Sequence, residues 1–404
     1  MKLKCGFRGR LVMMCALCLV ASWSASAQET FSQCLVRLQD QAQQQQLPAW
    51  IVQDVVPFLE KQERVVELDR NQPEFVQTFG QYLAARLTPS RIERGRQLYL
   101  QHRSFLDQLT RQYGVPGQYL VAFWGLETNF GSYLGTMPTL DSLATLACDP
   151  RRSDFFTEEF LNALHLMDRE QLQVDQMRGS WAGAVGHTQF MPSSYLKYAL
   201  DGDGDGRINL WSSEQDALAS GANFLASLGW VAGQRWGREV QLPMQFDYFS
   251  VGLNRPRSVG EWASLGLQTA FGSDLPEADF EAAVLVPSGA GGPAFLVYDN
   301  FEVIMRWNRS ESYALSVGLL ANRIAGAAGL VVQPSNEPGV RYEDIARLQQ
   351  VLADMNYNPG PVDGIWGPAT RQALAALQRD RGLVADGYPT PELVEALIRP
   401  GSTP

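Results

Sequence analysis

The chain has few cysteines for its length, with five in 404 residues. Cys5, Cys15 and Cys18 lie within the first 27 residues, so only Cys34 and Cys148 lie beyond them. Neither Cys15 nor Cys18 follows the small residue that a lipid anchor needs, which argues against lipidation. Two thiols that enter an oxidising compartment either form one bridge or stay as separate buried thiols, and the sequence leaves both outcomes open.

Long apolar runs are also missing, because no segment reaches the roughly 20 residues that span a bilayer. The short run at residues 11–21 follows a positively charged stretch and precedes Ser-Trp-Ser-Ala-Ser-Ala, which ends at residue 27. This order predicts a cleavable secretory signal peptide at residues 1–27 rather than a membrane anchor. The mature chain is expected to start at Gln28.

Positive charge is scarce, with 33 Lys and Arg against 43 Asp and Glu and a net charge of −10. Residues 1–27 carry four basic residues and no acid, so their removal takes the net charge to −14. Such an acidic protein has no electrostatic footprint for nucleic acid. Histidine is rare as well, and His187 has no nucleophile or ligand cluster around it in sequence, so we expect a cleft or surface residue rather than a catalytic one.

The distribution of apolar residues indicates a mainly α protein with a separate tail. Helical spacing dominates residues 48–228, and it returns at residues 311–327. Between them, short apolar runs at residues 283–286 and 294–298 predict strands or extended segments in a small β or irregular region. The predicted division is a main domain at residues 28–332, a linker rich in turn-formers at 333–340 and a small three-helix module at 341–400.

Glu127 stands near the end of a predicted apolar helix that begins after Pro116 and stops at Gly131. Helical spacing places its side chain on one stripe with Phe123 and Trp124. Burial against an apolar surface disfavours a charged carboxylate and raises its pKa, which suits a general acid. The alternative is a buried glutamate that pairs with an arginine or with backbone amides.

Four segments, taken in order, resemble one enzyme family. They are Glu-Thr-Asn-Phe-Gly at residues 127–131, the stretch from Ser180 to Tyr195, and residues 68–75 and 300–310. Together they are similar to lytic murein transglycosylases of the membrane-bound B type, in a soluble form with a signal peptide. The resemblance implies a lysozyme-like helical fold in the periplasm. It also implies non-hydrolytic cleavage between N-acetylmuramic acid and N-acetylglucosamine, with Glu127 acting first as acid and then as base to give a 1,6-anhydro product.

Neutral hydrogen-bonding groups accompany Glu127 in the second motif. Ser180 and Gln189 suit the N-acetyl and hydroxyl groups of sugars, and Gly183 and Gly186 allow close backbone approach, either to a ligand or to a neighbouring element. The resemblance assigns Ser180 and Gln189 to the wall of a sugar cleft. It also points to further saccharide contacts, although rings also fill cores; these candidates are Asn223, Phe224, Tyr298, Asn300, Trp307 and Tyr313.

No second acid lies in the two main motifs, where a two-carboxylate glycosidase would place its nucleophile or base. Asp141, Asp149 and Asp154 are near in sequence, so a lysozyme-like hydrolase stays open as an alternative. A third possibility is a peptidoglycan-binding protein without turnover, and the presence of Glu127, Ser180 and Gln189 argues against it.

An acidic glycine loop follows the second motif, and its spacing matches most of an EF-hand calcium loop. The final ligand position holds Ser212 instead of glutamate, and the resemblance favours Asp216 as its substitute. The alternative is a solvated acidic turn. The predicted ligands of a structural Ca²⁺ are Asp201, Asp203, Asp205, the carbonyl of Arg207, Asn209 and Asp216.

The tail resembles the peptidoglycan-binding domain found at the ends of many wall hydrolases, with turn signals at Asp363-Gly364 and Asp386-Gly387. Its expected work is to hold the enzyme on the wall. The predicted partners are therefore peptidoglycan glycan strands, with no nucleic acid and no organic cofactor. A monomer is expected, and proteins of cell-wall synthesis or regulation stay open as partners.

Overall fold

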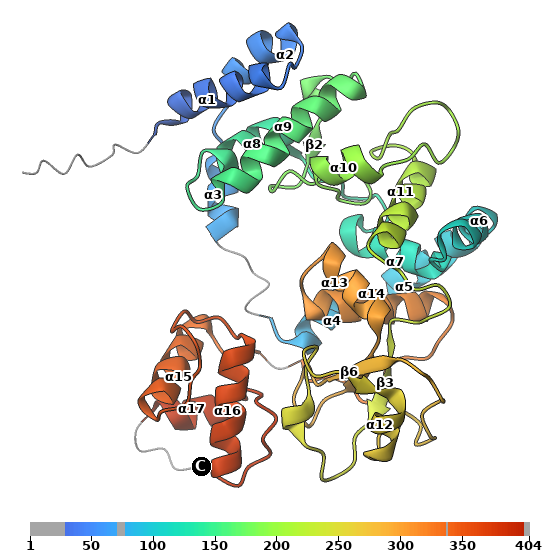
Figure 1. Ribbon diagram of the computed structural model, residues 1–404, viewed down its shortest axis with the longest axis vertical. Coiled ribbons are helices and arrows are strands. Elements are labelled where there is room, and N and C mark those ends of the chain that lie inside the picture. The colour runs from blue at the N-terminus through green and yellow to red at the C-terminus, as the bar shows by residue number, and fades with distance from the viewer. Residues whose placement is uncertain (1–28, 71–76, 337, 400–404) are drawn as a thin grey trace, which may run out of the picture.

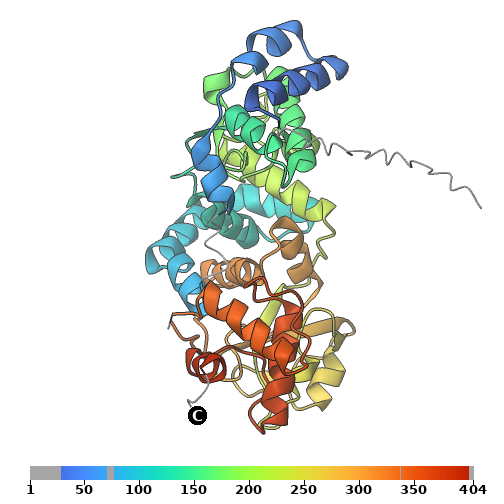
Figure 2. The same cartoon turned by 90° about the vertical axis from the view of Figure 1, so that its left-hand side faces the viewer.

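The computed structural model describes residues 29–70, 77–336 and 338–399, and Figure 1 shows how they are arranged. The predicted signal peptide at residues 1–27 lies outside the described residues. No helix in the described part is long and apolar enough to cross a membrane. The N-terminal helices and the C-terminal module lie at opposite ends of the molecule in both views (Figures 1 and 2).

A first lobe of helices encloses one hydrophobic core, which includes Leu38, Phe160 and Tyr195. Thr30 caps the first helix with a capping box, in which its hydroxyl accepts from the Gln33 amide. A disulfide joins Cys34 in this helix to Cys148 at the end of another, with 5.8 Å between the Cα atoms. The structure thus forms the bridge that the sequence left open. The helices of the lobe are α1 (Phe31–Gln44), α2 (Ala49–Asp54), α3 (Glu63–Arg70), α8 (Thr139–Ala147), α9 (Ser153–Arg169) and α10 (Pro192–Tyr198).

A second lobe packs around α7 (Gly117–Thr128) and forms a separate core. Helix α7 is buried on every side along residues 119–125, so the predicted single apolar stripe was too narrow a description. Asn129 ends α7 with a left-handed φ of 49°. The helices around it are α4 (Phe79–Arg86), α5 (Pro89–Gln101), α6 (Arg103–Tyr113), α11 (Glu214–Ser227), α13 (Asp299–Trp307) and α14 (Glu311–Ile324).

An antiparallel sheet below the second lobe has the strand order β4-β6-β7-β3-β5. Leu285 and Phe295 face the helical core, whereas Val284 and Leu296 face Trp262 of α12 (Val259–Ser264) on the other side. Because both faces are buried, the central strands are continuous apolar runs, as the sequence showed. The strands are β3 (Gly237–Gln241), β4 (Arg257–Ser258), β5 (Gln268–Thr269), β6 (Glu281–Leu285) and β7 (Ala294–Val297), while β1 (Met137–Pro138) and β2 (Arg178–Gly179) pair separately.

The tail forms the predicted three-helix module from α15 (Tyr342–Asp354), α16 (Pro368–Asp380) and α17 (Pro391–Ile398), around its own small core. The module also contacts the sheet region. The Ala290 amide donates to Asp386 Oδ2 at 2.8 Å, and the Arg379 guanidinium lies 4.6 Å from the centre of the Phe249 ring. A mainly α protein with a small β region and a helical tail is therefore confirmed, and the tail is packed against the sheet region as well as linked to it.

Candidate active site

Glu127 lies at the boundary between the cores of the two lobes. It is near the end of α7 in the second lobe, whereas Val185 and Phe190 of the second motif belong to the core of the first. Trp307 packs against both cores. The Glu127 side chain is only partly buried at this junction, so it is accessible to a ligand.

Two neutral donors hold the Glu127 carboxylate. Its Oε1 accepts from Trp307 Nε1 at 3.0 Å and from the hydroxyl of Tyr313 in a short hydrogen bond. Burial, and then the charge of Glu127, raise the pKa of Tyr313 well above its ordinary value, so the phenol keeps its proton and remains a donor. These donors are an indole and a phenol, and neither carries a charge.

The second motif folds into a tight loop around Ser180. The Ser180 hydroxyl accepts from the Ala184 amide at 3.0 Å, and Gln189 Nε2 donates to Leu134 O and Gly186 O. Both polar residues are partly exposed, so the hydroxyl proton of Ser180 and Oε1 of Gln189 stay available to a ligand.

Both glycines of this motif serve close packing. Gly183 (φ 87°) fits against Leu143, and a Cβ on Gly186 (φ 69°) would lie 2.5 Å from Leu210 O. They thus pack against α8 and the acidic loop, which supports the structural interpretation of the glycines over close approach to a ligand.

An aromatic cluster surrounds Trp307. Its ring centre lies 4.3 Å from that of Phe123, 5.4 Å from Phe190 and 5.2 Å from Phe224. The neighbouring Asn223 donates its side-chain amide to Tyr198 O at 2.9 Å. The structure therefore brings Asn223, Phe224 and Trp307 to the side of the site that α11 and α13 form.

Three predicted sugar contacts are corrected by burial. Tyr298 is 4% exposed and packs in the core between the sheet and α12, and Asn300 is fully buried, where its amide bonds Val231 and Gln234. Neither residue can touch a saccharide. Tyr313, also 4% exposed, lies beneath Glu127 and positions the carboxylate without forming a sugar surface.

His187 is buried at 7% exposure, so the expectation of a cleft or surface residue was wrong, although no catalytic role appears. Its Nδ1 accepts from Trp124 Nε1 at 2.8 Å, and its carbonyl accepts from the Thr128 hydroxyl. Burial lowers the pKa of His187, which keeps the imidazole neutral as this acceptor requires. His187 thus fastens the second motif to α7.

The sequence analysis missed two residues of α4 in the surroundings of Tyr313. Tyr82 packs in the same core as Tyr313, and the Arg86 guanidinium lies over the Tyr82 ring. Their spacing of four residues places them on one helix face, but nothing in the sequence indicated that this face meets α14. Tyr82 is 3% exposed, whereas Arg86 is partly exposed.

The acidic loop gathers Asp201, Asp203 and Asp205, which each offer an oxygen within 4.8 Å of the others. Backbone amides, first that of Gly206, lower the pKa of Asp201 and keep it charged. Asp216 is not in this group. It is buried, and its two oxygens accept the amides of Gly202 and Asn209, so it ties the loop ends together.

Asn209 and Arg207 also form hydrogen bonds within the loop. Asn209 Oδ1 accepts from the amides of Trp211 and Ser212, and the Arg207 amide donates to Asp205. Three of the six predicted ligands, Asp201, Asp203 and Asp205, thus lie together as an acidic cluster, and Asn209 and the Arg207 carbonyl stay predicted ligands.

The acids near the motif in sequence are engaged elsewhere. Asp141 accepts from the Glu60 amide, and Asp149 pairs with Arg70 at 3.5 Å. Asp154 lies in the first turn of α9, in the first lobe. None of these contacts draws a second acid toward Glu127.

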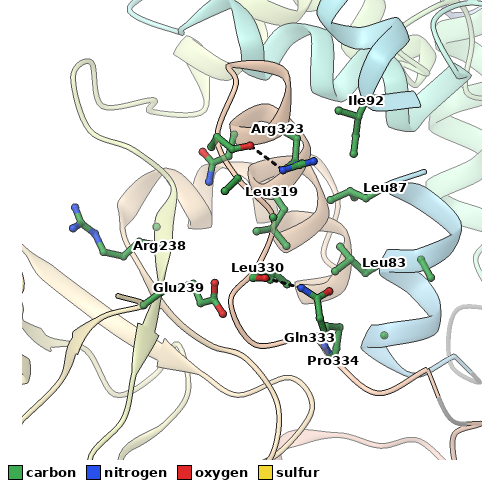
Figure 3. Close-up of a pocket in the computed structure, with 18 of the residues that line it drawn as sticks. Leu83, Leu87, Ile92, Arg238, Glu239, Leu319, Arg323, Leu330, Gln333 and Pro334 are labelled. Atoms are coloured by element: carbon green, nitrogen blue, oxygen red, sulfur yellow. Dashed lines mark hydrogen bonds between the residues drawn. The ribbon is translucent and has the colours of Figure 1, made fainter. Parts of the chain in front are cut away.

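A cavity of about 770 Å³ lies apart from these groups, between α4, the C-terminal half of α14 and β3 (Figure 3). Leu83, Leu87 and Leu319 line it, and Arg238 points away from it. The cavity contains none of the residues that the sequence predicted for the site.

Comparison with known proteins agrees with this geometry. The sequence pattern of the Transglycosylase SLT domain matches residues 30–322, and that of a peptidoglycan binding domain matches residues 341–397. Membrane-bound lytic murein transglycosylase B of Escherichia coli is 35% identical over 242 residues, which are 59% of this chain and 65% of that protein. The aligned part thus spans just under two thirds of this curated relative.

Solved structures extend the similarity over most of the chain. SltB3 of Pseudomonas aeruginosa, in complex with NAG-anhNAM-pentapeptide, has a TM-score of 0.87 and 40% identity, and the match covers 92% of this chain and all of SltB3. The Escherichia coli lytic transglycosylase Slt35 in complex with calcium has a TM-score of 0.65 and 30% identity, and covers 73% of this chain and 93% of that one. This chain belongs to the family of peptidoglycan lytic transglycosylases that carry an SLT domain, here followed by a peptidoglycan-binding domain.

Proposed function

We propose that this enzyme cleaves the β-1,4 bond between N-acetylmuramic acid and N-acetylglucosamine and leaves a 1,6-anhydro-muramoyl end, with Glu127 as its acid and base. The observation that carries the proposal is one partly exposed carboxylate held by two neutral donors at the boundary of the lobes. SltB3 binds glycan fragments that bear a pentapeptide. We therefore take glycan strands with stem peptides as the substrate of this chain.

The proposed reaction needs a single carboxyl group. Protonated Glu127 gives its proton to the glycosidic oxygen while the bond from that oxygen to C1 of the muramoyl sugar breaks. The carboxylate then removes the proton of the muramoyl C6 hydroxyl, and that oxygen closes on C1. Since Oε1 accepts the bonds of Trp307 and Tyr313, we assign the exchanged proton to Oε2.

Sugar binding is proposed for the partly exposed residues beside Glu127. Ser180 and Gln189 offer hydrogen-bonding groups to N-acetyl and hydroxyl oxygens, and Phe224 and Trp307 offer ring faces to the sugar. Asn223 supports the same wall through its bond to Tyr198 O.

The products decide between this reaction and hydrolysis. Purified sacculi are digested with the enzyme and the released muropeptides are weighed. We expect anhydro products, lighter by one water than hydrolysed ones. Products with reducing ends alone would identify a lysozyme-like muramidase, and no release at all would leave only wall binding.

Replacing Tyr313 with phenylalanine removes one donor to the Glu127 carboxylate. We expect kcat to fall about 10- to 100-fold, since a hydrogen bond to a charged group contributes about 1.5–3 kcal/mol. The donor favours the charged form, so the pH at which activity declines on the alkaline side should rise in the variant. Tyr298→Phe is the matched control, because this buried tyrosine lies in the other core, and kinetics that it shares with Tyr313→Phe would contradict the assignment.

We propose a structural Ca²⁺ at Asp201, Asp203 and Asp205, because three exposed carboxylates that close together repel one another without a cation. The ion would brace the loop, whose second half supports the active site: the His187 amide donates to Leu210 O.

Removal of calcium tests this site. With calcium at about 100 times its Kd the folded state gains about 2.7 kcal/mol, so a chelator should lower the midpoint of thermal unfolding by several degrees. Asp203→Asn should abolish most of this difference. An equal midpoint with and without chelator would rule out a site in the folded protein.

Export to the periplasm is proposed from the signal peptide at residues 1–27 and from a substrate that lies outside the inner membrane. A mature protein with Gln28 at its N-terminus, read by sequencing of the purified chain, is the expected result. A chain that retains residues 1–27 in the membrane fraction would indicate an anchor instead.

A further inference from the structure

We propose that Arg86 binds a carboxylate of the stem peptide on the glycan substrate, with the Tyr82 ring packed against its guanidinium and Arg91 bonded to its backbone carbonyl. The proposal rests on the proposed function, since it names a second contact of the same substrate. It makes Arg86 a residue that determines preference for peptide-bearing glycan.

Arg86 ends α4, one turn after Tyr82, and Tyr82 packs in the same core as Tyr313, which bonds Glu127. The next helix meets the end of α7 as well, because Arg91 Nε donates to Asn129 Oδ1 at 3.2 Å, two residues after Glu127. The corner between α4 and α5 therefore borders the active site.

The guanidinium of Arg86 packs on a buried ring. Its Cζ lies over the Tyr82 ring, 3.4 Å from the ring centre, and Tyr82 is 3% exposed. Stacking covers one face of the guanidinium and leaves the N–H groups in its plane for a partner. A planar fork of this kind matches the two oxygens of a carboxylate.

No such carboxylate is supplied by the described part of the chain. Within residues 29–70, 77–336 and 338–399, no acidic side chain pairs with Arg86. Arg151 and Arg152 differ in this respect, since both pair with the buried Asp69. Arg86 is thus a partly buried cation whose fork has no partner among these residues.

Arg91 adds a second positive charge to the corner. Its guanidinium donates to Arg86 O at 2.6 Å and closes the end of α4. Burial, and then the charge of Arg86, lower the pKa of Arg91, which shows that the two cations repel each other. A bound anion would relieve that repulsion.

The chemistry of the substrate selects the anion. N-acetylated sugars are uncharged, and the lactyl group of muramic acid is neutral once it is joined to a peptide. The free carboxylates of peptidoglycan lie on the stem peptide. Arg86 is therefore suited to the peptide and not to the sugar backbone.

The test compares two substrates. Cleavage is measured on glycan strands with free stem-peptide carboxylates and on strands whose stem-peptide carboxylates have been converted to amides. For Arg86→Ala, the increase of KM relative to the unsubstituted enzyme should be about ten-fold larger on the strands with free carboxylates than on the amidated strands. Arg86→Lys keeps the charge but not the fork, so its KM on the strands with free carboxylates should fall between that of the unsubstituted enzyme and that of Arg86→Ala. Arg94→Ala, which removes an exposed arginine of α5, is the matched control and should change neither KM.

Each other outcome overturns the proposal. An equal loss on both substrates would mean that Arg86 supports the catalytic pair or the fold, and no change on either would mean a surface charge. An unsubstituted enzyme that cleaves neither substrate would instead contradict the proposed function. Binding of a soluble disaccharide peptide to Glu127→Gln, with and without Arg86→Ala, separates affinity from turnover.

Discussion

Glu127→Gln is expected to lower cleavage of sacculi by at least about 10³-fold, because the amide can neither give nor take the proton in either step. The change should leave the fold intact. The glutamine carbonyl can still accept from Trp307 Nε1 and the Tyr313 hydroxyl, so the two donors stay paired. Release of muropeptides over time, together with the thermal midpoint, measures both effects.

The control for this variant is Glu93→Gln, which makes the same chemical change at an exposed position of α5. It should cleave at the rate of the unsubstituted enzyme. Wall binding should persist in Glu127→Gln, since the tail module has its own core. Substantial residual cleavage by Glu127→Gln would move the acid to another residue.

Loss of the disulfide is expected to destabilise the first lobe by about 3–5 kcal/mol. The bridge closes a segment of 114 residues between Cys34 and Cys148, and in the chain-entropy view long loops restrict the unfolded chain most. Cys34→Ala with Cys148→Ala removes it without leaving a thiol. Urea unfolding of the double variant should show a lower midpoint. Proteolysis should cut first between α1 and α3, because the bridge no longer ties α1 to the end of α8.

Chemical reduction of the disulfide is the matched comparison for the double variant. A thiol reductant should lower the midpoint of the unsubstituted enzyme by a similar amount and leave the double variant unchanged. An enzyme whose midpoint does not respond to reductant would show that the bridge either does not form or contributes nothing. Activity at low temperature should survive, because the bridge lies in the first-lobe core and Glu127 belongs to a helix of the second lobe.

Errors in the predicted sugar contacts share one cause. Tyr298, Asn300 and Tyr313 lie near Trp307 in sequence and, like Trp307, carry groups that suit a saccharide. The position of a residue in the sequence does not tell whether its side chain faces the core or the site. The structure turns Asn300 inward to bond Val231 and Gln234, and turns Trp307 toward Glu127.

The acidic loop shows the same limit for a metal site. Alternating aspartates predict a cluster, because a loop that alternates in this way brings their oxygens together, and the three do gather. Asp216 was chosen by its place after the tryptophan, yet it is buried and bonds two backbone amides. The spacing of residues within a loop is enough to predict that their side chains lie close together. It is not enough to predict the role of Asp216, because that role depends on how its helix packs.

Sequence by itself determined the chemistry that this chain carries: a glutamate after an apolar helix, a second motif with neutral polar groups, and a tail of the wall-binding type. These patterns are local, so they can be recognised without knowing how the helices pack. Only the tertiary structure decided what holds Glu127, because Trp307 and Tyr313 are 180 and 186 residues away along the chain. It alone also packed Tyr82, with Arg86 over its ring, into the core that holds Tyr313, and joined Cys34 to Cys148. Such contacts form where elements far apart in the sequence pack together, and no short-range pattern encodes which surfaces will meet.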